Sequence, residues 1–97
     1  MSWHVHVHSL AQADVQEACD WYDQQRVGLG EEFLCAIEDA LTQLEQQPTR
    51  HCVYYRGLRR MLPRRFPYKL FYLIDGENVH VLRVLHGRRD HRRQLRG

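Results

Sequence analysis

The sequence of 97 residues lacks the features of membrane and secreted proteins. Its apolar runs stay well short of the ~20 residues that a membrane-spanning helix needs. Its N-terminus has no basic segment followed by an apolar stretch, so nothing there marks the chain for secretion. We therefore expect a soluble, cytoplasmic protein. A chain this short favours a single domain, residues 1–97, with one hydrophobic core.

Cysteine is scarce, and its three positions, Cys19, Cys35 and Cys52, are widely and irregularly spaced. An odd number at such spacing fits neither a disulfide framework nor a zinc site built from cysteine pairs. Cys19 and Cys35 fall on apolar faces of predicted helices, where a thiol usually packs as a small hydrophobe. We therefore expect reduced, mostly buried thiols and no catalytic cysteine.

Acidic residues are few in the second half of the chain, and basic residues are few in the first. Residues 1–50 contain two arginines against nine acidic residues, a balance of −7, while residues 51–97 contain twelve basic and three acidic residues, a balance of +9. Eleven of those twelve are arginines, whose planar fork binds phosphate or carboxylate at two points. This division favours nucleic acid, the ribosome or an acidic protein as partner. Ion pairing between the halves is the alternative.

Hydrophobic periodicity predicts a strand and a helix at the start of the chain. Residues 3–8 alternate between apolar side chains and histidine, as a half-buried strand does. Ser9 resembles an N-cap, and Gln12 completes a capping box before a helix over residues 10–25.

A second helix is predicted after the glycines at positions 28 and 30 interrupt the first. Phe33, Ile37, Leu41 and Leu44 form its apolar stripe, and Pro48 ends it. The two helices are expected to form an antiparallel hairpin.

Strand periodicity replaces helical periodicity in the second half. Residues 58–63, 68–74 and 79–86 are predicted strands, residues 75–78 join the last two, and residues 87–97 form a polar basic tail. The predicted class is α+β: an N-terminal strand, an antiparallel helix hairpin and a three-stranded antiparallel meander, with the antiparallel sheet packed on the hairpin.

Three histidines, His4, His6 and His8, fall on one face of the first predicted strand. At this spacing two imidazoles can bind a metal together. No acidic or cysteine ligand lies nearby in sequence, so we interpret the segment as a solvent-facing edge strand. We expect neither a metal nor a cofactor.

Arginines and aromatic residues are interleaved in the basic half. The basic residues are Arg56, Arg59, Arg60, Arg64, Arg65, Lys69, Arg83, Arg88, Arg89, Arg92, Arg93 and Arg96. Tyr54, Tyr55 and Phe66 lie among them and could stack on nucleic-acid bases. Tyr68 and Tyr72 share one face of a predicted strand, and for them we favour a place in the core.

Several short motifs follow one another along the chain. They are Ala13-Asp14, Trp21-Tyr22, Gly28-Leu29-Gly30, Phe33, Leu41, Pro48, Arg65-Phe66-Pro67-Tyr68 with Tyr72, and residues 81–84 followed by His86-Gly87-Arg88-Arg89-Asp90. Together they resemble the ParE branch of the RelE/ParE toxins over nearly the whole chain. The most specific parts are Phe-Pro-Tyr-x-x-x-Tyr at residues 66–72 and Val-Leu-His-Gly-Arg-Arg-Asp at residues 84–90.

The resemblance implies a toxin that a cognate antitoxin holds inactive in a hetero-oligomer. In such pairs the antitoxin often lays an amphipathic helix in a hydrophobic groove and adds a strand to the sheet. An acidic antitoxin would also neutralise the basic half. Trp21, Tyr22, Phe33 and Ile37 are the expected antitoxin contacts.

The resemblance leaves two cellular targets open. RelE-like members resemble ribosome-dependent endoribonucleases, which use basic side chains and usually a C-terminal tyrosine or histidine to direct a 2′-hydroxyl at the adjacent phosphate of mRNA. The matching candidates here are Arg65, Lys69 and Arg89, with His86 or His91 as acid or base. Leu95 stands where a RelE-like tail carries its tyrosine.

ParE-like members resemble inhibitors of DNA gyrase, which trap cleaved DNA through a binding surface and hydrolyse no substrate themselves. The missing tyrosine and the arginine-rich tail favour this target. The candidate contacts are Arg59, Arg60, Arg65, Arg88, Arg89 and Arg93. A domain that binds an antitoxin but has lost toxicity is the third hypothesis.

Overall fold

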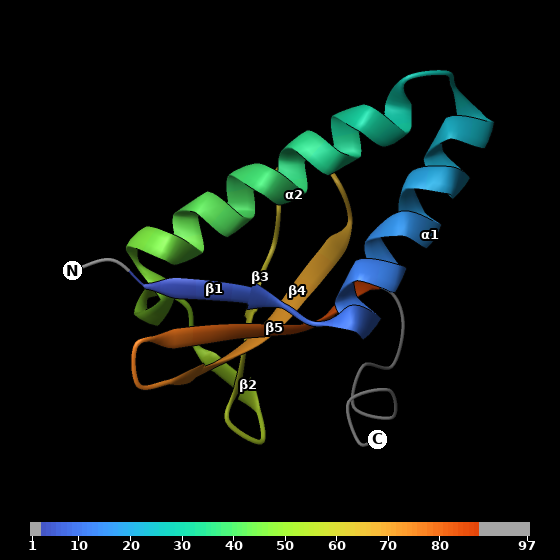
Figure 1. Ribbon diagram of the computed structural model, residues 1–97. Helices are drawn as coiled ribbons and strands as arrows, with labels where there is room; N and C mark the ends of the chain where they lie inside the picture. Colours follow the sequence, from blue (N-terminus) through green and yellow to red (C-terminus); the bar gives the residue numbers. More distant parts are fainter. Residues whose placement is uncertain (1–2, 88–97) are drawn as a thin grey trace.

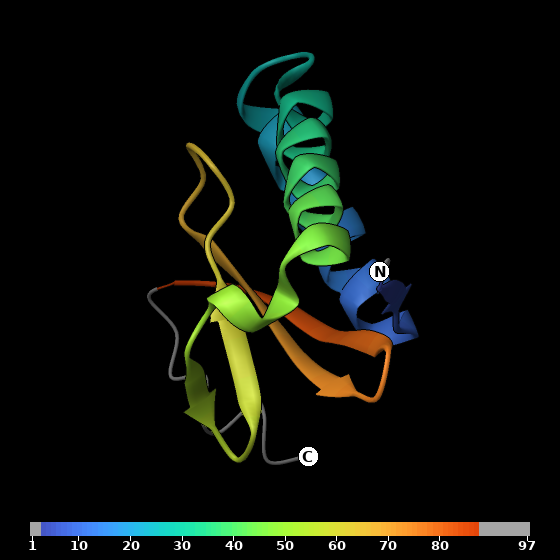
Figure 2. The same ribbon diagram turned by 90° about the vertical axis from the view of Figure 1, so that its left-hand side faces the viewer.

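The computed structural model describes residues 3–87 of the chain. Its elements, in chain order, are β1 (His4–Val7), α1 (Ser9–Gln25), α2 (Leu29–Gln46), the 3-10 helix η1 (Pro48–Arg50), β2 (Val53–Tyr55), β3 (Leu58–Met61), β4 (Tyr68–Asp75) and β5 (Asn78–His86). The five strands form one sheet, and α1 and α2 pack together over one of its faces (Figures 1 and 2). The α+β class and the element order predicted from the sequence are confirmed.

The sheet is mixed, with strand order β1-β5-β4-β3-β2. β3, β4 and β5 form the predicted antiparallel meander, but β1 pairs with β5 in parallel. The sequence predicts no pairing for the first strand, because both helices and the meander separate β1 from β5 and no tight turn sets their relative direction. β2 was missed, since three residues are too few to show a strand period.

The start of α1 differs from the predicted capping box. His8, in extended conformation, is the N-cap and Ser9 is the first helical residue, with no side chain capping the helix. The Gln12 amide donates to the Val7 carbonyl oxygen at 3.1 Å, so it binds the preceding strand and not the N-cap backbone.

The turn between the helices uses one glycine for its conformation and another for space. Gly28 precedes α2 with a φ of +87°, in the left-handed region that favours glycine. Gly30 lies inside α2 and does not interrupt it. Its amide donates to Asp23 Oδ1 at 2.8 Å, and an added Cβ would lie 2.5 Å from the carbonyl oxygen of Cys19. Gly30 therefore allows α1 and α2 to approach closely.

The core fills the space between the helices and the sheet. Tyr22 packs on Phe33 and Phe66 with ring centroids 5.3 and 5.0 Å away. Tyr72 is fully buried and donates to the Pro48 carbonyl oxygen at 2.6 Å, and burial raises its pKa to about 12. The predicted core position of Tyr72 is confirmed, whereas Tyr68 is only half-buried.

A β-bulge adjusts β5 to this core. Phe71 pairs with Arg83 and Tyr72 with Val81, so Leu82 is the extra residue on β5. The bulge lets Val81 and Val84 both join the core, although residues three apart on a regular strand face opposite sides. Within residues 3–87 no helix is long and apolar enough to cross a membrane.

Candidate functional site

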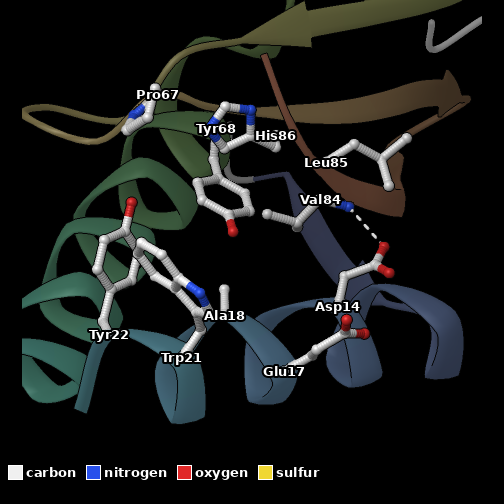
Figure 3. Close-up of a pocket in the computed structure, with 10 residues that line it drawn as sticks. All are labelled: Asp14, Glu17, Ala18, Trp21, Tyr22, Pro67, Tyr68, Val84, Leu85 and His86. Atoms are coloured by element: carbon white, nitrogen blue, oxygen red, sulfur yellow. Dashed lines mark hydrogen bonds between the residues drawn. The ribbon is translucent and has the colours of Figure 1, made fainter. Parts of the chain in front are cut away.

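A groove of about 430 Å³ runs between α1 and the ends of β4 and β5 (Figure 3). We call it the α1 groove. Its lining residues are Asp14, Glu17, Ala18, Trp21, Tyr22, Pro67, Tyr68, Val84, Leu85 and His86. The first five of these residues all lie on α1, at spacings of three and four positions that place them on one face of the helix. The residues from 84 to 86 close the opposite side.

Aromatic rings form much of the α1 groove. Trp21 is 54% exposed and meets the Tyr22 ring edge to face, with centroids 5.1 Å apart. Across the groove, the rings of Tyr68 and His86 lie 5.3 Å apart, on residues that are register partners in β4 and β5. Burial, and then the neighbouring Tyr68, raise the pKa of Tyr22, so its hydroxyl remains a neutral donor at physiological pH. The surface suits an apolar side chain with a polar edge.

Asp14 ties α1 to β5 at the rim of the α1 groove. Its carboxylate accepts hydrogen bonds from Arg83 Nε at 2.8 Å and Arg83 Nη2 at 3.0 Å, and from the Val84 backbone amide at 2.9 Å (Figure 3 draws the last). These bonds raise the pKa of Arg83. Asp14 and Arg83 are 69 positions apart in the sequence, so no local pattern predicts that they pair.

The four predicted antitoxin contacts lie in two different places. Trp21 and Tyr22 line the α1 groove. Phe33 and Ile37 are only 0% and 3% exposed and belong to the core, so in this structure they offer no surface to a partner. The apolar stripe of α2 faces the sheet, and the sheet already covers it.

The predicted target-binding arginines of the described chain have different surroundings. Arg59 donates to the carbonyl oxygens of Thr49 and His51, so it holds the segment before β2. Arg65, with a φ of +73°, pairs with Glu32 at 2.9 Å. Arg60 is exposed and forms no ion pair within residues 3–87, and its guanidinium lies over the Tyr54 ring, 4.4 Å from the centroid. Arg88, Arg89, His91 and Arg93 lie outside the described residues.

The remaining nuclease candidates are near each other, but Arg65 has another partner. Lys69 and His86 lie at the paired ends of β4 and β5. The Lys69 side chain runs beside Gly87, 3.6 Å from where a Cβ would stand on that glycine. Arg65, by contrast, is held by Glu32 in the first turn of α2. The hydrogen bonds from Arg65 and Arg26 lower the pKa of Glu32.

The histidines of β1 are exposed on an edge strand, as predicted. They are not isolated: His6 Nε2 lies 2.9 Å from Asn78 Oδ1, and His8 Nε2 lies 2.9 Å from His80 Nδ1. The described part of the chain contains no group of three or more histidine, cysteine or acidic residues arranged to hold a metal. His6 and His8 therefore link β1 and the residue after it to β5.

The thiols are free, but the expectation that they are mostly buried is wrong. Cys35 and Cys52 are exposed, because position 35 falls on the solvent side of α2. Cys19 is half-buried, and burial, Asp23 and Asp20 raise its pKa. A thiol held in its protonated form is a poor nucleophile.

These features define a class of protein: a small α+β domain whose helix pair covers one face of a mixed sheet and leaves a groove beside its first helix. The sequence model of the ParE toxin of the type II toxin-antitoxin system parDE matches residues 5–91. The chain therefore belongs to the ParE toxin family. No protein of curated function matches the sequence.

Two solved structures share the fold. One is a chain of the chromosomal ParDE toxin-antitoxin system of P. aeruginosa, at 21% identity and a TM-score of 0.69, covering 87% of this chain and 95% of that chain. The other is a chain of the toxin-antitoxin complex RelBE2 of Mycobacterium tuberculosis, at 24% identity and a TM-score of 0.64, covering 89% and 99%. Because ParDE and RelBE2 chains both match, the fold alone does not distinguish the two branches.

Proposed function

We propose that this chain is the toxin of a toxin-antitoxin pair, that its cognate antitoxin binds in the α1 groove, and that the released toxin inhibits DNA gyrase. Membership of the ParE family supports the first part. The two similar structures come from toxin-antitoxin systems, which supports a hetero-oligomer with an antitoxin.

The observation that carries the antitoxin site is the exposed indole of Trp21 beside the α1 groove. A large aromatic side chain that is exposed beside an apolar groove stabilises a complex when a partner covers it, because its apolar surface is then removed from water. Aromatic side chains near the centre of an interface are frequent hot spots. An amphipathic helix of the antitoxin, with its apolar face towards Trp21 and Tyr68, fits this groove.

Replacing Trp21 with alanine should weaken antitoxin binding by at least about tenfold. Leu10→Ala is the matched control, because Leu10 is also an exposed apolar residue of α1 and does not line the α1 groove. Both affinities are measured by isothermal titration calorimetry with the purified antitoxin. Equal affinities for the two variants would exclude the α1 groove as the main antitoxin site.

The arrangement of basic residues supports binding to a target over cleavage of one. Acid–base catalysis on mRNA requires basic and proton-transferring groups around one phosphate. Arg65 is engaged by Glu32 and Arg59 by backbone carbonyls, while His86 packs on Tyr68. A gyrase inhibitor needs only a complementary surface, for which we propose Arg60 and the tail arginines Arg88, Arg89 and Arg93.

A gyrase assay with purified chain tests this target. Linear plasmid DNA should accumulate when gyrase, ATP and the chain are incubated together and the protein is then digested. Truncation after Gly87 should abolish this effect and leave antitoxin binding intact. If gyrase is unaffected and the chain cuts mRNA on ribosomes, the endonuclease alternative with Arg65, Lys69, Arg89, and His86 or His91 replaces the proposal. Inactivity in both assays would favour the non-toxic domain.

A further inference from the structure

The β2–β3 hairpin, residues 53–61, is a second surface feature that the α1 groove does not involve. β2 is the edge strand of the sheet at the end opposite β1. In Figures 1 and 2 the tip of the hairpin points away from the helix pair. The helix pair therefore does not cover the tip, and the two residues of its turn, Arg56 and Gly57, are exposed.

The turn of the β2–β3 hairpin carries an arginine where backbone geometry disfavours one. Tyr55 pairs with Leu58 across a two-residue turn, and Arg56 and Gly57 have φ values of +50° and +79°. Two positive φ values are typical of a type I′ hairpin turn, whose first position is usually asparagine, aspartate or glycine. A residue held in such a conformation points to a role for its side chain.

Tyrosine rings support the two exposed arginines of the β2–β3 hairpin. The guanidinium of Arg56 lies 5.3 Å from the Tyr55 ring centroid, and that of Arg60 lies 4.4 Å from the Tyr54 centroid. Tyr54 in turn packs on the buried Phe71, with centroids 5.6 Å apart. Such stacking orients a guanidinium while its N–H groups remain available to an anion.

No carboxylate of the described chain neutralises these two arginines. The sequence contains no acidic residue between Glu45 and Asp75. Among residues 3–87 the ion pairs use other cations: Arg26, Arg65 and Arg83. The β2–β3 hairpin therefore presents positive charge that no carboxylate of residues 3–87 compensates, and an external anion can bind there.

We propose that the β2–β3 hairpin binds duplex DNA, with Arg56 and Arg60 contacting backbone phosphates. A two-stranded β-ribbon fits the major groove of B-DNA, and arginine forks match phosphate oxygens. Phosphate contacts fix position and carry no sequence information, so binding is independent of sequence. The inference deepens the proposed gyrase inhibition, because it names the DNA held by gyrase as a direct contact of the toxin.

The test compares paired substitutions that remove the same charge. Arg56→Gly with Arg60→Gln removes both contacts, and glycine suits the positive φ at position 56, so the turn should still form. Arg50→Gln with Arg64→Gln is the control, because both of these arginines are exposed outside the β2–β3 hairpin. Thermal melts establish that both full-length double variants are folded.

Binding is measured by fluorescence anisotropy with a short labelled DNA duplex over a range of salt concentrations. The hairpin variant should bind about tenfold more weakly than the control variant. Its slope of log K against log salt should be smaller by roughly 2, since each phosphate contact contributes about 0.9. Equal affinities and slopes for the two variants would overturn the proposal.

Two further titrations identify the partner. If the hairpin substitutions weaken binding of single-stranded RNA or of the antitoxin and leave duplex DNA binding unchanged, the proposal is also overturned. None of these titrations contains gyrase. A wild-type chain that fails to poison gyrase therefore leaves the DNA-binding result standing, and a hairpin that fails to bind DNA leaves gyrase inhibition through the tail standing.

Discussion

Replacing Asp14 with alanine is expected to destabilise the domain by about 2–4 kcal/mol. Asp14 is the acceptor of three hydrogen bonds, two from Arg83 and one from the Val84 amide. Its side chain is 12% exposed and that of Arg83 is 23% exposed, so water replaces these bonds only in part. Loss of one partner of a buried ion pair costs about 3–5 kcal/mol, and the residual exposure of Arg83 lowers this figure.

The change is measurable by urea and thermal denaturation followed by circular dichroism. For a domain of this size 1 kcal/mol corresponds to roughly 4–8 °C, so Tm should fall by roughly 10–25 °C. Asp20→Ala is the control on the same helix, because Asp20 is exposed and accepts one hydrogen bond, from Gln16. An exposed substitution of this kind should cost less than about 0.5 kcal/mol.

Two further variants separate the charge from the hydrogen bonds. Asp14→Asn keeps an acceptor for the Val84 amide and should be more stable than Asp14→Ala. Combining Asp14→Ala with Arg83→Met should cost less than the sum of the single changes, because each single change strands the other partner. If Asp14→Ala is as stable as Asp20→Ala, or if the two changes are additive, the pair does not hold α1 on β5.

Three other predictions concern residues around the helix pair and η1. Tyr72→Phe should cost about 1–3 kcal/mol by stranding the Pro48 carbonyl. Because burial raises the Tyr72 pKa from 10 to about 12, the wild type should lose stability as pH rises through that range and the variant should not, as alkaline urea titrations can show. Gly30→Ala should cost about 1–3 kcal/mol in thermal melts, since its Cβ would meet the Cys19 carbonyl; an unchanged Tm contradicts the close approach. Burial, Arg50 and Arg59 lower the pKa of His51, so stability should fall as pH drops below 6.5, and His51→Gln should flatten this fall in acid urea titrations.

Local patterns were enough to predict most elements of this fold. The apolar spacing of α1 and α2 and the alternation of β4 and β5 are visible within single segments, and the structure confirms them. The parallel pairing of β1 with β5 was not predictable, because it depends on where the helices return the chain. β2 is defined by its partner β3 and has no pattern of its own.

The candidate site was predictable only in part, because periodicity identifies apolar faces without showing what covers them. The spacing of Phe33 and Ile37 correctly predicts an apolar face, but the core buries this face, so it is closed to a partner. Trp21 lies beside that interface and remains open to solvent. The Asp14–Arg83 pair joins residues 69 positions apart, and charge counts along the sequence cannot reveal such a pairing.

The two proposed surfaces lie on different parts of the sheet, which affects how an antitoxin can neutralise this toxin. The α1 groove ends at His86, next to Gly87, where the basic tail begins, whereas β4 and β3 separate β5 from the edge strand β2. An antitoxin helix in the α1 groove would therefore lie against the base of the tail and leave the β2–β3 hairpin exposed. On the proposed functions, neutralisation acts first on gyrase binding through the tail, and the bound toxin retains its DNA contacts.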